Sequence, residues 1–326
     1  MKFGVLSTAG IARKSLIPAI HASDHEVTAV ASRDAETAAT FAANNGIPAS
    51  YGSYERLLSA DVDAVYNPLP NALHAEWTRR AADAGLDVLC EKPLTTDAES
   101  AADLFDYCED AGVTLMEAFM YHFHPRTVRA REIASEELGA VRSVEAAFKF
   151  RLDDPADIRL NPELGGGSLF DVGSYAVSAA RNFLGEPDRA YAHLADTRDS
   201  GVDTEAAGVL EYADGRTARV ASGFDTTHVE RYRVEAVDGY LEATDCFGPG
   251  RTSVGLTYGV DGREVTETFD AVDQYRLQVD HFAEAAAAGT TPRVDRAETV
   301  ANMRAIDALR ASAAEGRPVP VGRDGE

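Results

Sequence analysis

Three residues of the chain could move a proton during an oxidation or a reduction. Lys92 follows the apolar run 88–90 almost directly, which places its ammonium group at the carboxyl end of a strand, where a parallel sheet binds its ligands. Asp171 and Tyr175 are spaced i,i+4, so a helix puts them on one face, one turn apart. A lysine in such a place can lower the pKa of a neighbouring acid. The three residues are candidate catalytic groups; the alternatives are a strand-end surface lysine and a structural helix with a buried tyrosine.

The first strand-to-helix turn, residues 7–12, reads Ser-Thr-Ala-Gly-Ile-Ala. A dinucleotide fold needs small residues here, because the backbone must approach the pyrophosphate and the helix must point its free N–H groups at it. Ser7, Ala9 and Ala12 stand where the pattern G-x-G-x-x-G has glycine, so the turn is either a degenerate form of that pattern or an ordinary tight turn. The candidate cofactor contacts in this turn are Thr8, Ala9, Gly10 and Ile11.

The end of the second strand bears on which nicotinamide dinucleotide fits. A carboxylate at this point binds the ribose 2′-hydroxyl of NAD, whereas an arginine accommodates the 2′-phosphate of NADP. The sequence reads Ser32-Arg33, and the first carboxylate comes only at Asp34. Ser32 and Arg33 are therefore candidate cofactor contacts that favour NADP, with NAD as the alternative.

Two further loops follow the third and fourth strands expected in the first half of the chain. Residues 67–74 contain Pro-Leu-Pro-Asn and end at a histidine, and residues 91–93 read Glu-Lys-Pro. Both loops leave the carboxyl ends of strands, so we expect their side chains beside the ligand crevice of the sheet. The histidine could equally be structural. The candidate cofactor contacts in these loops are Leu69, Asn71, His74, Glu91 and Lys92.

Short apolar runs alternate with helical periods over the first third of the chain. The pattern predicts strands at residues 2–6, 26–32, 64–67, 87–91 and 114–118, and helices at 11–21, 35–45, 54–58, 72–84 and 98–111. Strands separated by helices of this size predict βαβ units and a doubly wound parallel sheet. We therefore expect an α/β dinucleotide-binding Rossmann domain over residues 1–121.

The rhythm changes after about residue 122. Longer β-like runs predict strands at 144–152, 190–195, 206–212, 217–223, 232–237, 240–244, 253–258 and 264–269, and helices follow at 274–288 and 297–315. Asp-Gly pairs at 214, 238 and 261 are expected to supply the positive φ angles of tight hairpins. We expect an α+β domain over residues 122–326, with an open, mostly antiparallel sheet that packs on one face and is free on the other.

The charge balance excludes some partners. The chain has 31 Lys and Arg against 54 Asp and Glu, a formal net charge of -23, which disfavours nucleic acid and anionic membrane surfaces. Lysine occurs only at positions 2, 14, 92 and 149, so arginine supplies nearly all the positive charge. This composition is expected of a halophile protein that stays hydrated in concentrated salt; the alternative is an ordinary acidic enzyme.

Length and apolar patterning suggest how the protein is organised and where it works. A chain of 326 residues predicts about two domains. No apolar run approaches the ~18 residues of a membrane span, so we expect a soluble, cytoplasmic protein. Cys90, Cys108 and Cys246 form no C-x-x-C pair, which suggests neither a disulfide framework nor a zinc site. The free sheet face predicts a dimer or tetramer.

Taken together, these residues resemble those of the glucose-fructose oxidoreductase and inositol dehydrogenase family, Gfo/Idh/MocA. The most specific combination is Glu-Lys-Pro at 91–93 followed by Gly-Gly-Gly-x-Leu-x-Asp-x-Gly-x-Tyr at 165–175. The other segments that carry the resemblance are 7–12, 32–33, 69–74, 117–125 and 273–276. The resemblance covers nearly the whole chain. Within the family, the sequence looks most similar to the branch that holds D-xylose 1-dehydrogenases and dimeric dihydrodiol dehydrogenases.

The resemblance implies an NADP-dependent sugar dehydrogenase, with D-xylose oxidised to its lactone by hydride transfer. It also implies that Lys92 and Tyr175 are the proton-transfer pair. The C-terminal domain would bind the sugar and form a homodimer or homotetramer through its sheet. This chemistry needs a base but no metal and no covalent nucleophile, so Tyr175 would take the proton with the help of Lys92, and Asp171 would orient a second sugar hydroxyl.

Two departures from the family pattern and several other functions stay open at this point. Thr37 stands where a second cation for the 2′-phosphate is often found, and His122 stands where arginine is common before Phe-His-Pro. The same residues could serve a reductase of dicarbonyl or anhydro-sugar substrates, or a trans-dihydrodiol dehydrogenase. A nucleotide-sensing regulator without turnover is an alternative of another class, and a metal enzyme built on His122 and His124 is a further one.

Overall fold

The chain forms two compact units in a computed structural model, which describes residues 1–322. The first unit comprises Met1–Met120 and Asp273–Thr299, and the second comprises Tyr121–Val272 and the chain from Val300 on. The first change of unit falls beside the boundary expected at residue 121. The sequence pattern does not predict that residues 273–299 return to the first unit, where Phe282 packs its ring 6.1 Å from that of Phe3.

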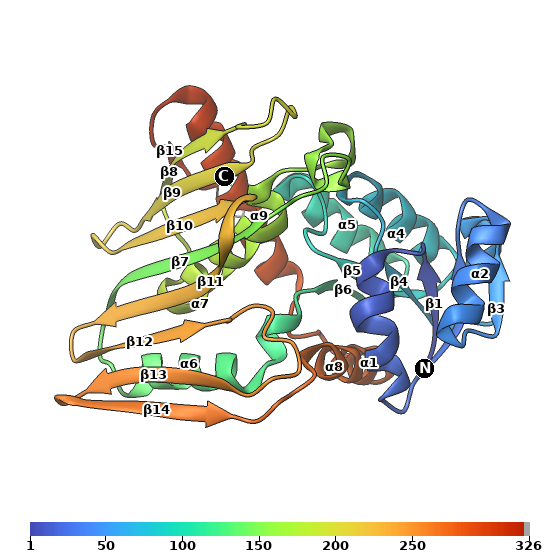
Figure 1. Cartoon of the computed structure of the whole chain (residues 1–326), viewed down its shortest axis with the longest axis horizontal. Coiled ribbons are helices and arrows are strands. Elements are labelled where there is room, and N and C mark those ends of the chain that lie inside the picture. The colour runs from blue at the N-terminus through green and yellow to red at the C-terminus, as the bar shows by residue number, and fades with distance from the viewer. Residues whose placement is uncertain (323–326) are drawn as a thin grey trace. The chain divides into compact units, whose positions relative to one another are not determined.

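The first unit is built on a parallel sheet with the strand order β3-β2-β1-β4-β5-β6 among residues 1–322. Its strands are β1 (Lys2–Leu6), β2 (Glu26–Ala31), β3 (Ala49–Tyr51), β4 (Ala64–Asn67), β5 (Asp87–Glu91) and β6 (Leu115–Ala118) (Figure 1). The order reverses between β1 and β4, and the carboxyl ends of strands at such a switch point form the ligand crevice. The predicted Rossmann-type sheet is confirmed, and β3 is a short edge strand that the sequence pattern does not predict.

Helices cover this sheet, and several of them begin with a side-chain cap. They are α1 (Ile17–His21), α2 (Ala35–Asn45), α3 (Tyr54–Leu58), α4 (His74–Asp83), α5 (Ala98–Asp110) and α8 (Gln274–Ala288). Asp34, Ser53 and Asp97 each accept a backbone N–H at the start of a helix, which satisfies a donor that the helix itself cannot. A π-helical turn, Ala12–Leu16, leads into α1.

The second unit is built on a larger sheet, with the order β14-β13-β12-β11-β7-β10-β9-β8-β15 among residues 1–322. Its strands are β7 (Val141–Arg151), β8 (Arg189–Ala195), β9 (Glu205–Glu211), β10 (Thr217–Gly223), β11 (Asp225–Ala236), β12 (Gly239–Thr244), β13 (Val254–Val260), β14 (Arg263–Phe269) and β15 (Val319–Pro320). Among the described strands of this sheet, β7 and β10 form the one parallel pair, and the other neighbours run antiparallel. The expected open, mostly antiparallel sheet is confirmed.

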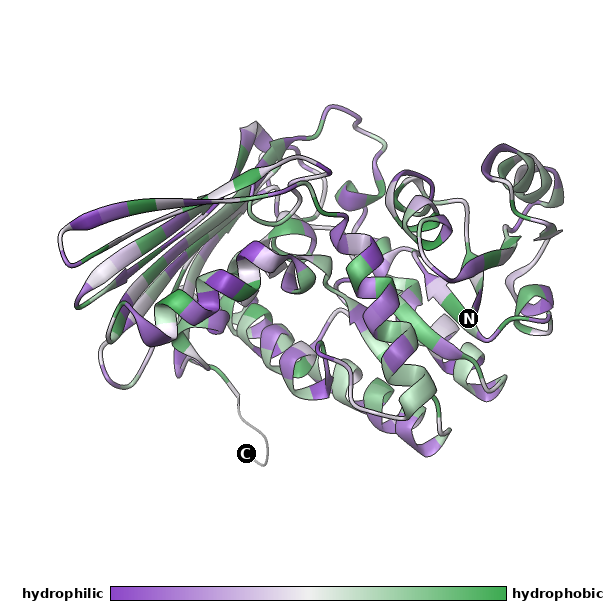
Figure 2. Ribbon diagram, turned by 90° about the horizontal axis from the view of Figure 1, so that it is seen from below, coloured by the Kyte–Doolittle hydropathy of each residue, from purple (hydrophilic) through white to green (hydrophobic). Residues whose placement is uncertain are grey.

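The two faces of this sheet differ. The helices of the unit are α6 (Pro125–Glu136), α7 (Ser174–Leu184) and α9 (Arg296–Glu315), which begins in the first unit; α7 packs on β7 and β10, and α6 on β12 and β13. Along β11, Tyr232 and Val234 are buried while Arg231 is exposed, and Figure 2 shows this alternation along the strands. The opposite face carries ion pairs such as Arg231 with Glu145 at 2.7 Å. The sequence pattern does not predict α6.

The Asp-Gly turns are not all alike. Asp261 and Gly262 both have positive φ, 52° and 72°, as a two-residue hairpin of type I′ requires. The expectation is wrong for Asp238-Gly239, since neither residue has positive φ. A Cβ on Gly239 would lie 2.1 Å from the carbonyl oxygen of Gly259, so close packing of two strands, rather than an unusual φ, requires glycine there.

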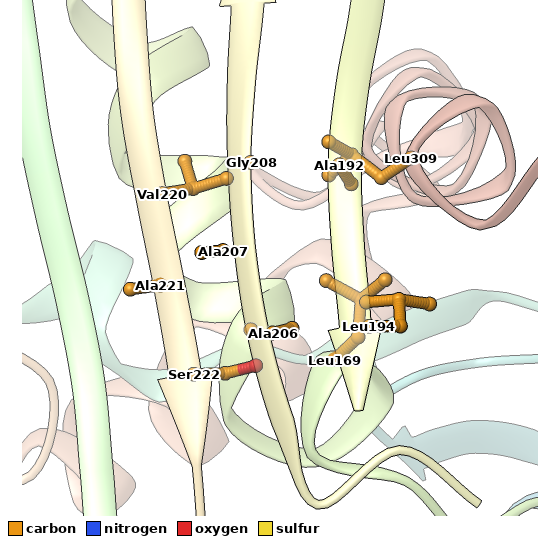
Figure 3. A pocket seen from close by; sticks show the side chains of 11 residues that line it. Leu169, Ala192, Leu194, Ala206, Ala207, Gly208, Val220, Ala221, Ser222 and Leu309 are labelled. Carbon is orange, nitrogen blue, oxygen red and sulfur yellow. The ribbon is translucent and has the colours of Figure 1, made fainter. Parts of the chain in front are cut away.

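A small apolar cavity lies between the second sheet and the elements packed against it (Figure 3). Residues of β8, β9 and β10 line it together with Leu169, Gly173 and Leu309. Ser222 is the one polar side chain in the lining drawn from residues 1–322, and its hydroxyl lies 3.0 Å from that of Ser168. The cavity offers no charged group for chemistry, so we assign it to core packing. Separately, among residues 1–322 no helix has both the length and the apolarity to cross a membrane.

Candidate active site

The turn after β1 holds a non-glycine residue in a conformation that favours glycine. Ser7 has a φ of 125°, a region that costs energy for a residue with a Cβ and is retained where function over-determines the backbone. The N–H of Ala9 donates to the Ser7 hydroxyl at 3.2 Å, and Ala12 is fully buried. Around Gly10, no heavy atom of the described residues would come within 4 Å of an added Cβ. The turn thus keeps the backbone path of the glycine-rich pattern although all three of its glycines are replaced, and it leaves room for a pyrophosphate.

An open groove runs from this turn along α2. It is lined by Thr8, Gly10, Arg13, Asp34, Glu36, Thr37, Thr40, Phe41, Asn44 and Asn45. Of the sequence-predicted contacts, Thr8 and Gly10 line the groove, whereas Ala9, Ile11, Ser32 and Arg33 are not part of this lining. Arg13 is the functional candidate that sequence reasoning missed, because it lies beyond the pattern on the first turn of the helix.

Asp34 is tied to α2 rather than directed freely into the groove. Its carboxylate accepts the backbone N–H of Thr37 at 2.7 Å and the Thr37 hydroxyl at 2.6 Å, and both bonds lower the pKa of Asp34. Thr37 therefore completes a helix cap where the family often has a cation. Arg33 is exposed and lies close enough to Tyr54 to oppose the rise in that phenol's pKa, which burial causes. Two arginines, Arg13 and Arg33, can supply positive charge near this end of the groove.

His74 joins the two loops at the carboxyl ends of β4 and β5. Its Nε2 lies 2.7 Å from the carbonyl oxygen of Leu69, and its Nδ1 lies 2.9 Å from that of Pro93. The side chain is fully buried, and burial lowers the pKa of His74 to about 4. Both ring nitrogens face carbonyl groups, so the contacts support a positioning role for His74. Asn71, three residues earlier in the same loop, is half-buried.

The loop around Lys92 is held by two carboxylates. Tyr66 donates its hydroxyl to Oε1 of Glu91 at 2.5 Å, and Lys92 itself is half-buried and precedes a cis proline bond. Buried Glu117 accepts the N–H of Leu94 at 2.8 Å and the hydroxyl of Thr299 at 3.0 Å. Burial raises the pKa of Glu117 to about 7, although its hydrogen bonds and the Lys92 ammonium oppose the rise. Glu117 is a second group that the sequence analysis did not single out.

Tyr175, in the second unit, stands in the first turn of α7 within a wall of aromatic rings. Its ring centroid lies 5.3 Å from that of Phe247, 5.5 Å from Phe148 and 5.8 Å from Tyr121. Asn182 donates to the Tyr121 hydroxyl at 2.7 Å, which fixes one member of this wall. These rings give the Tyr175 phenol a largely aromatic surrounding.

Asp171 is paired with an arginine that sequence reasoning missed. Nε of Arg159 lies 2.6 Å from Oδ2 of Asp171, and Arg159 also contacts Asp157 at 3.2 Å. The two carboxylates, Asp171 first, raise the pKa of Arg159. Asp171 lies in a π-helical turn, Leu169–Gly173, that runs directly into α7, so it precedes Tyr175 by one turn.

The glycine run before this turn is needed for close backbone approach. A Cβ on Gly166 would lie 2.4 Å from the carbonyl oxygen of Arg159, and one on Gly167 would lie 2.5 Å from Oδ1 of Asp203. The Asp203 carboxylate in turn accepts the N–H of Leu169 at 2.8 Å. The glycines therefore bring the Arg159 backbone against the start of the turn that carries Asp171.

The two histidines considered as metal ligands have other partners. Nε2 of His122 lies 3.1 Å from the Ser178 hydroxyl. Nδ1 of His124 accepts the N–H of Arg126 at 3.1 Å at the start of α6, and burial lowers the pKa of His124 to about 4. Their contacts support structural roles.

Comparison with known proteins identifies both halves of the chain. Residues 1–119 match the domain described as oxidoreductase family, NAD-binding Rossmann fold, and residues 126–242 match the GFO/IDH/MocA C-terminal domain. The chain is 61% identical over 322 residues to a D-xylose 1-dehydrogenase (NADP(+)) of Haloferax volcanii, covering 98% of this chain and 99% of the relative. It is 31% identical over 250 residues to a trans-1,2-dihydrobenzene-1,2-diol dehydrogenase of Xenopus tropicalis, covering 76% of this chain and 74% of the relative.

A solved structure shares the fold over nearly the full length. A 3-ketoreductase of Actinomadura kijaniata in complex with NADP and TDP-benzene superposes with a TM-score of 0.91 at 34% identity, over 96% of this chain and 97% of that one. The resemblance drawn from the sequence motifs is confirmed, as is the expected oxidoreductase class. The chain belongs to the Gfo/Idh/MocA oxidoreductase family, with an NAD-binding Rossmann domain followed by the family's C-terminal domain.

Proposed function

We propose that this protein is an NADP-dependent aldose dehydrogenase that oxidises D-xylose to its lactone. The observation that carries the proposal is the 61% identity, over almost the whole of both chains, to the D-xylose 1-dehydrogenase (NADP(+)) of Haloferax volcanii. The φ of 125° at Ser7 and the open space at Gly10 support the cofactor class, because both serve the approach of backbone to a pyrophosphate.

The preference for NADP rests on two arginines. Arg13 lines the groove between the first turn and α2, and Arg33 follows β2 directly. A 2′-phosphate needs such cations to bind its negative charge, particularly on a protein whose net charge of -23 repels anions. The Asp34 carboxylate accepts the backbone N–H and the hydroxyl of Thr37. Because it is engaged in this helix cap, Asp34 disfavours a bound 2′-phosphate less than an uncapped carboxylate would.

The chemistry assigns a role to three residues. Bound NADP supplies the hydride acceptor. Tyr175 accepts the proton of the sugar hydroxyl, and the ammonium of Lys92 stabilises the phenolate, whose ordinary pKa of ~10 is too high for a base at neutral pH. Asp171, whose Oδ2 lies 2.6 Å from Nε of Arg159, accepts a hydrogen bond from a second hydroxyl. The domain boundary near residue 121 then separates a nucleotide-binding domain from a sugar-binding domain.

The free face of the second sheet is proposed as the surface through which the chain forms a homodimer or homotetramer. Its ion pairs, Arg231 with Glu145 at 2.7 Å and Arg233 with Glu242 at 2.8 Å, are exposed. In concentrated salt, counter-ions screen the net charge of -23, so two copies of this acidic chain can approach each other through such a face. The acidic composition also favours a cytoplasmic enzyme of a halophile. Sedimentation equilibrium in molar KCl tests the assembly, and a monomer at all concentrations would remove the proposal.

The test of the proposed function is an initial-rate screen of pentoses and hexoses with NADP+ and with NAD+ in molar KCl. We expect the highest kcat/KM for D-xylose with NADP+. Silence of every aldose with both cofactors would contradict the proposal.

A second candidate, reduction of a keto-sugar or oxidation of a trans-dihydrodiol, has specific support. The 3-ketoreductase superposes with a TM-score of 0.91, and the dihydrodiol dehydrogenase is 31% identical. The same screen discriminates the candidates when it includes a 3-keto-sugar with NADPH and a trans-dihydrodiol with NADP+, since a kcat/KM higher there than with D-xylose selects the second function.

A further inference from the structure

Three side chains with metal-binding atoms meet in the second unit, apart from the residues used above. They are His228 and Glu230 on β11 and Asp245 directly after β12. Nε2 of His228 lies 3.6 Å from Oε2 of Glu230 and 3.9 Å from Oδ1 of Asp245, and the ligand atoms of the group all lie within 4.8 Å of one another. These separations are close to those between the ligands of one metal ion, whose bonds to N and O are about 2.0–2.2 Å long.

Glu230 makes this group more than a cluster of surface charges. Its side chain is only 1% exposed, and Oε1 accepts the N–H groups of Phe247, at 3.2 Å, and Gly248, at 2.5 Å. Among residues 1–322, Oε2 accepts no hydrogen bond and faces His228 and Asp245. A cation could therefore bind Oε2 without displacing a hydrogen bond between described residues.

The backbone holds the three ligands in place. His228 lies within an irregularity in the pairing of β11 with β7, between Asp225 and Val229, and its ring packs 6.0 Å from that of Phe148. The N–H of Asp245 donates to the carbonyl of Glu230 at 2.7 Å, and the buried guanidinium of Arg126 donates to the carbonyl of Asp245. Ligands fixed in this way lose little freedom when an ion binds.

The local charges also favour a cation. The carboxylates of Glu230 and Asp245 belong to one group of ligand atoms that lie within 4.8 Å of one another. Two adjacent carboxylates repel each other, and a divalent ion between them would remove the repulsion and favour ionised Glu230. The charged groups beside Glu230 are thus Asp245 and His228, with Arg126 directed at carbonyl oxygens.

We propose that His228, Glu230 and Asp245 bind one divalent transition-metal ion of the class of Zn²⁺ and Mn²⁺. One imidazole nitrogen and two carboxylate oxygens suit these ions, with water completing the coordination. The ion links β11 to the segment after β12 and braces the aromatic wall through Phe148, which packs 5.5 Å from the ring of Tyr175. The site is structural, so the expectation that the chemistry itself uses no metal is unaffected.

Calorimetric titration of the whole protein with ZnCl₂, MnCl₂ and MgCl₂ tests this proposal. The titrations are made in about 1 M KCl, where a Debye length of about 3 Å suppresses diffuse binding to the acidic surface. We expect one saturable Zn²⁺ or Mn²⁺ per chain, with Mg²⁺ much weaker. His228→Ala and Asp245→Asn should each weaken binding by about tenfold or more, and both side chains are more than half exposed, at 57% and 63%, so the variants should fold.

Matched controls are available in the same unit. His193→Ala removes an exposed histidine of β8, and Asp261→Asn changes an exposed aspartate with a positive φ like that of Asp245. Neither should alter the titration. Absence of a saturable site in the wild type, or equal weakening in the controls, overturns the proposal. Because the readout is binding, this result is independent of whether the protein oxidises D-xylose.

Discussion

At the scale of single residues, the candidate site depends on how each charge is held. Arg159 contacts Asp171 at 2.6 Å, and in the proposed mechanism it positions the carboxylate that binds a sugar hydroxyl. Glu117 instead is buried with two hydrogen bonds, at 2.8 Å to Leu94 and 3.0 Å to Thr299, beside the loop that carries Lys92. The groups that act and the groups that position them are thus joined by short, directed contacts.

Glu117 should make the stability of the protein depend on pH. Its folded pKa is raised from 4.5 to about 7, so the folded state keeps a proton that the unfolded chain loses. The contribution of protonated Glu117 to the free energy of unfolding is fully present below pH 4.5 and is lost as pH rises through about 7. Glu117→Gln retains the neutral form, so the free energy of unfolding of the wild type should fall relative to this variant between pH 5 and pH 8. Urea unfolding at several pH values measures the difference, and a constant difference would contradict the assignment.

Arg13 should discriminate between the two cofactors. A hydrogen bond to a charged group contributes about 1.5–3 kcal/mol, so Arg13→Ala should raise the Kd for NADPH about tenfold or more and leave the Kd for NADH nearly unchanged. Fluorescence titration of the bound cofactor at fixed KCl measures both constants. Lys14→Ala is the control, since Lys14 is exposed and is not part of the groove lining. Equal weakening of NADPH and NADH would exclude Arg13 as a phosphate contact.

Residue types and strand ends could be predicted from the sequence, but contacts between distant residues could not. Lys92 and Tyr175 were identifiable because each follows a recognisable local pattern. Arg159, by contrast, reaches Asp171 across a loop, and Glu117 reaches Thr299 from the far end of the chain. Neither contact leaves a local pattern in spacing or periodicity.

At the scale of elements, periodicity predicted the strands and helices that carry the site. It missed β3 and α6, because a three-residue strand is too short to show alternation and the polar residues of α6 obscure its apolar face. It also treated Asp238-Gly239 as a positive-φ turn, whereas the glycine is required by a contact with Gly259. Local spacing predicts an element's type well, but a close approach from another strand is a tertiary effect.

The glycine run before α7 should affect both the stability of the protein and its binding of the sugar. Gly166→Ala places a Cβ 2.4 Å from the Arg159 carbonyl oxygen, so the backbone must move, and overpacking of this kind costs about 1–3 kcal/mol. We expect a lower Tm together with a raised KM for the sugar, because Arg159 positions Asp171. Gly255→Ala is the matched control, since Gly255 has no positive φ and the nearest described atom to a Cβ there would be the Thr266 side chain at 3.5 Å, an ordinary van der Waals distance. If both variants lose Tm equally and neither changes KM, the glycine run does not position the site.

At the scale of the whole molecule, the excess of acidic residues predicts a dependence on salt. A net charge of -23 repels itself in the folded state, and salt screens that repulsion. The Tm should therefore rise when KCl increases from about 0.1 M, where the Debye length is about 10 Å, to about 1 M, where it is about 3 Å. Circular dichroism melts over this range measure the effect, and a Tm that falls or stays constant would show that the acidity has another purpose.

In the proposed mechanism, Tyr175 takes the proton from the sugar while Lys92 stabilises the phenolate. This step is tested by measuring kcat of the Tyr175→Phe variant with D-xylose and NADP+. The Kd of the same variant for NADPH is measured in parallel. The ring of Tyr175 packs among Phe247, Phe148 and Tyr121, and phenylalanine preserves that packing. We expect kcat to fall by about 10²-fold or more while the Kd for NADPH remains near that of the wild type; a variant with near-normal kcat would contradict the account.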